Sequence, residues 1–382
     1  MRIAQVAPLF VKIPPVRYGG TERVVSALTE ELVRRGHDVT LFAAGTCETS
    51  ARLHPVCPQP LWDMDLADPL AVRIQQVEEV VRLSAEFDVI HSHVDYLPWL
   101  AGERLRADLI TTFHGRLDLP ELRPLFRSYQ GQALVSISNA QRRPLADLGL
   151  NWVATVHHGL SLGETYRFGT GGAGYLAFLG RIAPEKDPVS AIKVAIRAGL
   201  PLKIAARVDP VDLEYFRTEV EPLLQHPLIE WVGELDDRGK DELLGGAIAL
   251  LMPVAWEEPF GLVFIEALAT GTPVISRPRG SLPELIRDRE DGFLAESEAE
   301  LVQACHLASS LDRAGCRRRA LERFSVSRMA DDYESAYGKL APRRRPPPAR
   351  SRTRLVGPHD GPFVRGRSAS QTGDSADASR AS

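Results

Sequence analysis

The 382-residue sequence has little cysteine and no long hydrophobic run. Its four cysteines show neither CxxC nor Cys/His ligand spacing, which argues against a disulfide framework and a zinc site, and we expect them to be reduced in a cytoplasmic protein: Cys47, Cys57, Cys305 and Cys316. No apolar run approaches the roughly 20 residues that span a bilayer. Near the N-terminus Lys12 and Pro14-Pro15 interrupt the apolar residues, so we predict a first buried strand there rather than a signal peptide.

The sequence also lacks a strong excess of either charge. Its net charge of −4, with 44% hydrophobic and 25% charged residues, is ordinary for a globular chain and gives no case for a nucleic-acid binder. The length suits two domains. The exception is 341–382, where nine Arg against three Asp give +6 and leave about −10 for the preceding residues. This basic tail has little to bury, so we predict disorder and at most peripheral membrane contact.

The first half of the sequence alternates strand and helix patterns. An apolar strand pattern over 2–8 is followed by a loop with Gly19-Gly20 and then by a helical pattern over 21–35. Adjacent glycines between a strand and a helix let backbone N–H groups approach a diphosphate closely. An ordinary flexible turn has the same composition, so the two glycines alone are a weak signal.

Histidines follow two later strand patterns in this half. His91 and His93 end the pattern over 87–93, and His114 follows the pattern over 109–113. A residue at the carboxyl end of a parallel strand faces the ligand crevice rather than the core. An imidazole there can donate a hydrogen bond or a proton. A purely structural role is the alternative, and it is favoured more for His91 and His93 than for His114.

Two short motifs fit functional patterns only superficially. Asp63-Met64-Asp65 matches the DxD pattern of metal-dependent transferases, but it lies in an irregular segment, 47–70, with no strand pattern leading into it. We therefore predict no metal site. Gly169–Gly174 fits GxGxxG, yet a dinucleotide-binding loop follows a strand, and these glycines precede the strand pattern over 175–179. We predict a flexible linker there.

Two cations follow the first strand pattern of the second half. Gly180 and Arg181 come directly after it, and Lys186 precedes the next helical pattern, 188–198. Fixed positive charges beside a helix start are what a departing diphosphate needs as it gains charge. Isolated Arg and Lys residues are usually exposed surface groups, so the pair needs support from other motifs. Further along, Gly233 ends the strand pattern over 229–233.

Two carboxylates lie eight residues apart after the apolar run 247–252. Glu258 is in a loop, and Glu266 is in the helix that opens near Gly261. Free N–H groups and the dipole of a helix N-terminus hold phosphate, and a carboxylate beside them can accept hydrogen bonds from sugar hydroxyls. Two glutamates on an amphipathic helix are more often a solvated face. The residues around them, EPFGL and EALATGTPVI, change that balance.

Together these motifs resemble the family 4 retaining glycosyltransferases of the GT-B fold. The resemblance covers roughly residues 1–340, and it rests on Glu258-x7-Glu266, on GR-x4-K at 180–186 and on the GG loop. It implies an α/β protein with two Rossmann-like, doubly wound parallel-sheet domains facing a cleft. It further implies transfer of a sugar from a nucleoside-diphosphate sugar, with retention of configuration and without a metal or other cofactor.

The resemblance also implies roles for individual residues. Arg181 and Lys186 would offset charge on the leaving diphosphate, Glu266 would hold the ribose, and His114 would contact the sugar or acceptor. Glu258 would grip the donor sugar, together with backbone N–H groups of the next loop: Phe260, Gly261 and Leu262. Gly19-Gly20 would line the phosphate or acceptor side, and the turn at Gly233 would lie beside the nucleobase. No carboxylate stands out as a nucleophile, which fits front-face transfer.

We expect five segments in the chain. They are an acceptor domain (1–166), a Gly-rich linker (167–174), a donor domain (175–324), a helix that packs back on the first domain (325–340) and the basic tail (341–382). The acceptor remains open among a sugar, a lipid-linked molecule and another small molecule. Two other functions remain open as well: a sugar-nucleotide epimerase on the same fold, and a non-catalytic nucleotide-sugar-binding protein.

Overall fold

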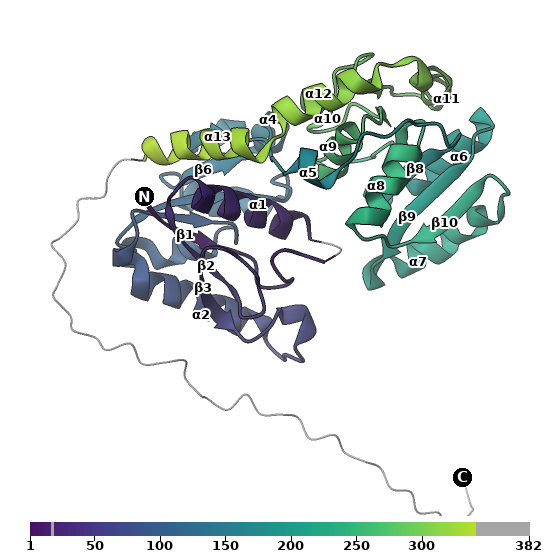
Figure 1. The fold of residues 1–382 in the computed structure, drawn as a ribbon. Coiled ribbons are helices and arrows are strands. Elements are labelled where there is room, and N and C mark those ends of the chain that lie inside the picture. The colour runs from purple at the N-terminus through teal and green to yellow at the C-terminus, as the bar shows by residue number, and fades with distance from the viewer. Residues whose placement is uncertain (17–18, 341–382) are drawn as a thin grey trace, which may run out of the picture. The chain divides into compact units, whose positions relative to one another are not determined.

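The structure, a computed structural model, describes residues 1–16 and 19–340. Within these residues the chain forms two parallel β-sheets, each accompanied by helices (Figure 1). The predicted basic tail, 341–382, lies outside the described residues. None of the described helices is long and apolar enough to cross a bilayer.

The first half of the chain builds one sheet, whose described residues form seven parallel strands in the order β3-β2-β1-β4-β5-β6-β7. The strands are β1 Arg2–Val6, β2 Asp38–Ala44, β3 Arg52–Cys57, β4 Val89–Ser92, β5 Asp108–Thr112, β6 Ala133–Ser136 and β7 Trp152–Thr155. The helices are α1 Gly20–Arg34, α2 Pro69–Leu83, α3 Leu122–Ser128, α4 Asn139–Arg142 and α5 Leu162–Thr165. The strand order reverses beside β1, so the loops after β1 and β4 flank the crevice where such sheets bind ligands.

The second half builds a sheet of six described parallel strands in the order β10-β9-β8-β11-β12-β13. They are β8 Leu176–Ile182, β9 Leu202–Val208, β10 Ile229–Gly233, β11 Leu250–Leu251, β12 Val274–Ser276 and β13 Gly292–Leu294. The helices are α6 Pro188–Ala198, α7 Leu213–Tyr215, α8 Asp237–Gly246, α9 Leu262–Ala269, α10 Leu282–Leu285, α11 Glu298–Leu307 and α12 Arg313–Arg323. Here the order reverses beside β8, so the loops after β8 and β11 flank the second crevice.

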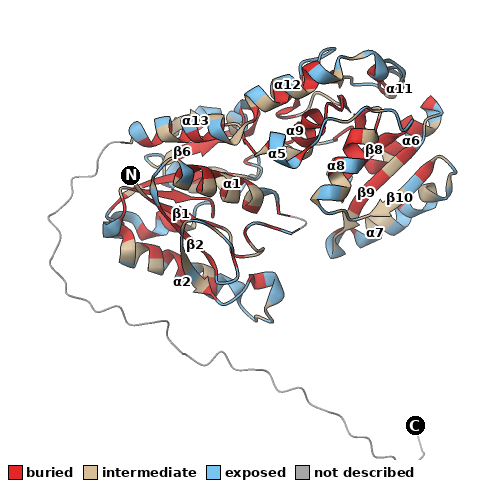
Figure 2. Cartoon of the chain, in the orientation of Figure 1, coloured by how far each residue is buried: buried red, intermediate tan, exposed pale blue. Residues whose placement is uncertain are grey.

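Local signals explain the helices that border these crevices. Helix α6 begins where the Asp187 carboxylate accepts a hydrogen bond from the Ser190 N–H at 3.0 Å, and it ends at Gly199 in the left-handed conformation. In α1 the apolar stripe found in the sequence is buried against the sheet, as at Val24 and Leu28. Figure 2 shows the same arrangement throughout, with buried strands inside and the exposed faces of helices outside.

The last described helix, α13 Val326–Gly338, returns to the first half of the chain. It packs against α1 and β7 (Figure 1). Its buried face includes Tyr333 and Tyr337, and on its outer side Glu334 pairs with Arg35 at 2.7 Å. The C-terminal helix therefore completes the core beneath the first sheet.

Two segments differ from the expectation. The stretch 47–70 was expected to be irregular, yet β3 within it pairs with β2, because hydrogen bonds to a neighbouring strand can order a segment that has weak strand propensity. The Asp-Gly pair at 291–292 is typical of a tight turn, yet Gly292–Leu294 is strand β13, paired with β12. A Cβ at Gly292 would overlap the backbone of Val274, so this glycine permits a close approach between strands.

The glycine-rich segment 167–174 packs against the second half of the chain through backbone hydrogen bonds. The Gly169 N–H donates to the Thr270 carbonyl at 2.9 Å, and the Gly171 N–H donates to the Gly245 carbonyl at 3.0 Å. A Cβ at Gly169 would overlap the backbone of Gly245. At Gly169 the lack of a side chain permits this close packing of the expected linker.

Candidate active site

The crevices of the two sheets open into one cavity of about 540 Å³. It brings together nearly all of the residues predicted from the motifs: Gly19, Gly20, His114, Gly180, Arg181, Lys186, Glu258, Phe260, Gly261, Leu262 and Glu266. Gly233 does not line it, although the next residues, Glu234 and Leu235, do. The motifs from the two ends of the chain thus meet at a single site.

Lys186 and Glu258 form an ion pair at this site. The Lys186 Nζ donates to Glu258 Oε2, and the indole N–H of Trp256 donates to the same oxygen at 2.9 Å. The Lys186 ammonium also lies 5.0 Å from the centroid of the Trp256 ring. Glu258 is only 5% exposed, so its charge depends on these partners.

The loop that carries Glu258 is fixed by its backbone. The Ser281 N–H donates to the Glu258 carbonyl at 2.9 Å. Gly280 has φ +56°, and a Cβ there would overlap the Glu258 backbone. From the other half, the Ser138 hydroxyl donates to the Pro259 carbonyl at 2.7 Å. The position of the carboxylate is therefore set by both halves of the chain.

Helix α9 begins at the cavity without a capping side chain. Its N-cap, Gly261, has φ +86° and offers no side-chain acceptor to the first N–H groups. Leu262 and Val263, in the first turn, line the cavity. Such an uncapped N-terminus suits a phosphate or another anion. Glu266, one turn further along, also lines the cavity and is 6% exposed.

Arg181 is the second-to-last residue of β8, and carboxylates surround its guanidinium. Its guanidinium donates to Glu185, to Asp209 at 3.3 Å and to Asp212 at 3.1 Å. A diphosphate that binds Arg181 must therefore compete with, or replace, these acids. The sequence motif predicted the cation; of its acidic partners, Glu185 lies within the motif but was not singled out, and Asp209 and Asp212 lie outside it.

His114 ends a chain of buried hydrogen bonds that leads to helix α13. Gln5 Oε1 can only accept, so His93 Nε2 donates to it at 2.7 Å, and His93 Nδ1 accepts from His114 Nε2 at 2.9 Å. The Gln5 amide in turn donates to the Tyr337 hydroxyl at 3.4 Å. His114 is thereby assigned as the Nε2–H tautomer.

The hydrogen bonds continue beyond Tyr337. Its hydroxyl lies 2.8 Å from His91 Nδ1, and His91 Nε2 lies 2.8 Å from the Thr112 hydroxyl, which is 3.1 Å from the Tyr333 hydroxyl. His91 and His93 are fully buried within this network. Their burial and hydrogen bonds are consistent with a structural role, which the sequence favoured more for these two residues than for His114.

Burial keeps the histidines of this region neutral. It lowers the pKa of His114 to about 3, and it lowers the pKa of His93 and of His158 well below the usual value, with the nearby imidazoles adding to the effect. His158 stacks on His114 with ring centroids 5.2 Å apart. The Nδ1 atoms of both rings are buried and make no hydrogen bond among the described residues. For His114 that atom is a free acceptor.

One ion pair joins the two halves at the edge of the cavity. Arg23 on α1 donates two hydrogen bonds to Asp237 on α8, at 2.8 and 2.9 Å. Lys240 pairs with the same Asp237 at 3.3 Å. Sequence reasoning missed Arg23, as it missed Glu22 and Trp256. The available signal was their position, because each lies within three residues of an identified motif residue, Gly20 or Glu258.

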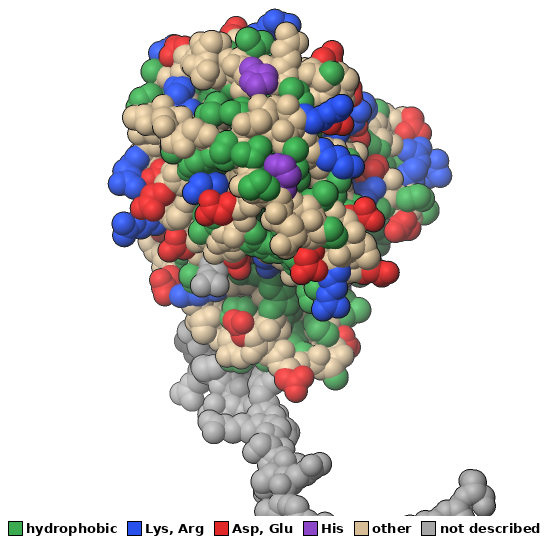
Figure 3. All heavy atoms as spheres, turned by 90° about the vertical axis from the view of Figure 1, so that its right-hand side faces the viewer, with side chains coloured by type: hydrophobic (Ala, Val, Ile, Leu, Met, Phe, Trp, Pro, Cys, Tyr) green, Lys and Arg blue, Asp and Glu red, His purple; other side chains and the backbone are tan. Residues whose placement is uncertain are grey.

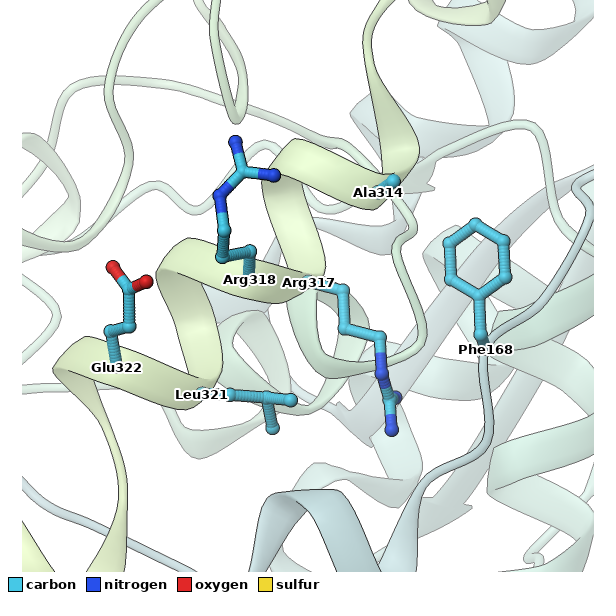
Figure 4. Close-up of a pocket in the computed structure, with 6 residues that line it drawn as sticks. All are labelled: Phe168, Ala314, Arg317, Arg318, Leu321 and Glu322. Carbon is cyan, nitrogen blue, oxygen red and sulfur yellow. The ribbon is translucent and has the colours of Figure 1, made fainter.

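Other features fall outside this site. The described residues contain no cluster of three or more His, Cys, Asp or Glu side chains arranged to hold a metal ion. A second, shallow pocket lies over α12 (Figure 4) and is lined by Phe168, Ala314, Arg317, Arg318, Leu321 and Glu322. On the face shown in Figure 3, basic and acidic side chains of the described residues are interspersed.

Two Rossmann-like parallel sheets that meet at one cavity are the architecture of the GT-B fold. Sequence models of two families match the chain: Glycosyltransferase Family 4 over residues 18–164 and Glycosyl transferases group 1 over residues 170–320. The chain belongs to the family 4 glycosyltransferases. This confirms the predicted family, fold class and kind of enzyme.

Individual relatives agree with this assignment. The phosphatidyl-myo-inositol mannosyltransferase of Mycobacterium leprae is 26% identical, over 89% of this chain and 97% of its own. The D-inositol 3-phosphate glycosyltransferase of Mycolicibacterium smegmatis is also 26% identical, over 85% of this chain and 90% of its own. Among solved structures, Anabaena HepE in complex with UDP and glucose has a TM-score of 0.70 at 17% identity, covering 89% of this chain and all of its own.

Proposed function

We propose that this enzyme transfers a sugar from a nucleoside-diphosphate sugar to an acceptor hydroxyl, with retention of configuration and without a metal ion. The observation that carries the proposal is the convergence of two cations, two carboxylates and an uncapped helix N-terminus on one cavity. These groups match the parts of a nucleotide sugar: a diphosphate, a ribose and a hexose.

Each group has a proposed role. Lys186 and Arg181 offset the charge that the diphosphate gains as it leaves, assisted by the N-terminus of α9. Glu266 accepts hydrogen bonds from the ribose hydroxyls. Glu258, with the N–H groups of Phe260, Gly261 and Leu262, holds the donor sugar. His114 accepts a hydrogen bond from a sugar hydroxyl through Nδ1.

The comparisons support the class of donor. HepE was solved with UDP and glucose, and the two mycobacterial relatives are a mannosyltransferase and a glycosyltransferase. A pyrimidine or purine nucleoside-diphosphate hexose is therefore the donor class to test first. No described carboxylate is proposed as a nucleophile, so the leaving diphosphate is proposed to take the proton of the attacking hydroxyl on the same face.

The test begins with donor binding. Purified protein is screened with UDP-glucose, UDP-galactose, UDP-N-acetylglucosamine and GDP-mannose for a rise in melting temperature, since a ligand that binds only the folded state stabilises it. Nucleoside diphosphate release is then measured with acceptors, with and without EDTA. The anomeric configuration of the product is read by NMR. A nucleotide sugar recovered as its epimer would identify an epimerase instead.

Variants test the proposed charges. We expect Lys186→Ala and Arg181→Ala each to lower turnover by about 10²-fold or more, as expected when one charge-stabilising group is lost. Arg197→Ala is the matched control, because Arg197 lies on α6 with its side chain 66% exposed and pairs only with a surface carboxylate, Glu298, in the described structure. Full activity in both cavity variants would rule out the mechanism.

A further inference from the structure

The wall that the first half contributes to the cavity differs in charge from the wall of the second half. Its described charged residues are Glu22 and Arg23. Arg23 is engaged by both oxygens of Asp237. The cations Arg181 and Lys186 belong to the opposite wall. Arg207, also from the opposite wall, lies over the Trp62 ring and pairs with Asp209 at 2.8 Å. The described cations nearest the acceptor side, Arg23 and Arg207, are therefore each already paired with a carboxylate.

Glu22 is unusual on this wall because it is a carboxylate that is nearly buried. It is 7% exposed and forms no ion pair among the described residues. Burial raises the pKa of its carboxyl group, against a hydrogen bond from its own backbone N–H. A nearly buried carboxylate without a cation is costly unless it hydrogen-bonds, and hydroxyl groups of a ligand would satisfy it.

The position of Glu22 also disfavours the binding of an anion at this wall. It lies in the first turn of α1, a helix of 15 residues whose N-cap, Gly19, provides no side-chain acceptor. The free N–H groups of that turn would otherwise favour a phosphate. Because the Glu22 carboxylate already lies there, a phosphate on the acceptor would meet a like charge.

The rest of this wall suits a sugar ring. The rings of Phe10 and Trp62 lie with centroids 6.1 Å apart, and both residues line the cavity. Trp62 is 60% exposed, and the Arg207 guanidinium, which pairs with Asp209 at 2.8 Å, lies 5.9 Å from the centroid of its ring. His114 adds a neutral acceptor, the unpartnered Nδ1. Apolar ring faces with a few polar groups are typical of sites for polyhydroxylated ligands.

We infer that the acceptor is an uncharged polyhydroxylated ring, a sugar or cyclitol without a phosphate near the reacting hydroxyl, held between Glu22 and the Phe10–Trp62 pair. This inference rests on the proposed function. In the reaction the acceptor oxygen bonds to the anomeric carbon while the bond from that carbon to the diphosphate oxygen breaks. The bonding electrons leave with the diphosphate, which also takes the hydroxyl proton. Glu22 orients the hydroxyl groups of the acceptor and is not consumed.

Matched acceptor pairs test this assignment. The donor is whichever of the four nucleotide sugars raises the melting temperature most, and the pairs are glucose with glucose 6-phosphate and myo-inositol with myo-inositol 1-phosphate. We expect kcat/KM to be at least about tenfold higher for the uncharged member, because the phosphate of the other member would meet the like charge of Glu22. A preference for the phosphorylated members overturns the inference.

Glu22→Gln tests the residue itself. It should lower kcat/KM for the uncharged acceptors about 10- to 100-fold and narrow the difference within each pair, while the donor-induced rise in melting temperature stays unchanged. Glu103→Gln, at an exposed position away from the cavity, should change neither. If the ratio of kcat/KM between the uncharged and the phosphorylated acceptor is the same in Glu22→Gln as in the wild type, the proposed role of Glu22 is overturned.

The outcomes separate this inference from the proposed function. Donor binding without transfer to any uncharged acceptor refutes the acceptor assignment alone. Absence of binding to all four donors, with no nucleoside diphosphate released, refutes the proposed function and the inference with it. The wild-type comparison needs no variant to fold, so it decides the question by itself.

Discussion

The carboxylate of Glu284 makes a pH-dependent contact between the two halves of the chain. It belongs to α10 and accepts hydrogen bonds from the N–H groups of Asn139 at 2.9 Å and Ala140 at 2.7 Å, at the start of α4. His157 Nε2 lies 3.1 Å away. Burial would raise the pKa of Glu284, but the His157 and backbone hydrogen bonds outweigh it and lower the pKa to about 2.

The size of this contribution follows from the shift. From 4.5 to about 2 is roughly 2.5 pKa units, which corresponds to about 3 kcal/mol at about 1.4 kcal/mol per unit. Because the pKa is lower in the folded state, the stabilisation is complete above about pH 4.5 and is lost as the pH falls towards 2. At pH 3 about one unit, or roughly 1.4 kcal/mol, should remain.

Urea unfolding of the wild type and of Glu284→Gln checks this. The variant should be less stable by about 2–3 kcal/mol at pH 7, and the difference should shrink by more than half by pH 3. Comparing the two proteins at each pH cancels the titration of the other groups, and Glu103→Gln serves as the neutral control. A difference that stays constant from pH 7 to pH 3 would refute the reasoning.

Two further substitutions test the supports of the site. Gly280→Ala should lower stability by about 2–4 kcal/mol and weaken donor binding, because its Cβ would overlap the Glu258 backbone at a positive φ; Gly131→Ala, with open space around it, is the control, and equal melting temperatures would contradict this. Tyr337→Phe should leave donor binding intact and lower kcat about tenfold, because without the Tyr337 hydroxyl the hydrogen-bond chain no longer fixes His114 as the Nε2–H tautomer. A loss of donor affinity as large as the loss of kcat would indicate that Tyr337 has only a structural role.

Local signals predicted much of the fold. Helix α6 was expected over 188–198 and lies there, because Asp187 and Gly199 mark its two ends. Strand β13 was missed because Asp-Gly also signals a turn, and only the close approach to Val274 explains why Gly292 lies in a strand. Pairing of this kind depends on residues distant in the sequence, which a local pattern does not contain.

The candidate site shows the same division. The resemblance to family 4 glycosyltransferases implied that Lys186 and Glu258, from two separate motifs, share one site, and they form an ion pair. Asp209 and Asp212 beside Arg181, and the network from His114 to Tyr337, had no local signal, since their members come from separate segments of the chain. Their roles in catalysis remain predictions.

The ion pair also indicates how the site prepares for its donor. Lys186 and Glu258 satisfy each other in a nearly buried position, where an unpaired charge would be costly. Under the proposed function, a nucleotide sugar would supply each with a new partner, since its diphosphate would replace the carboxylate at Lys186 and its hydroxyls would replace the ammonium at Glu258. A bare diphosphate would offer only the first exchange and would leave Glu258 with the Trp256 indole N–H as its partner. The proposal therefore predicts that the site favours a diphosphate that carries a sugar over one that does not, which would help the enzyme to bind its donor and to release the nucleoside diphosphate.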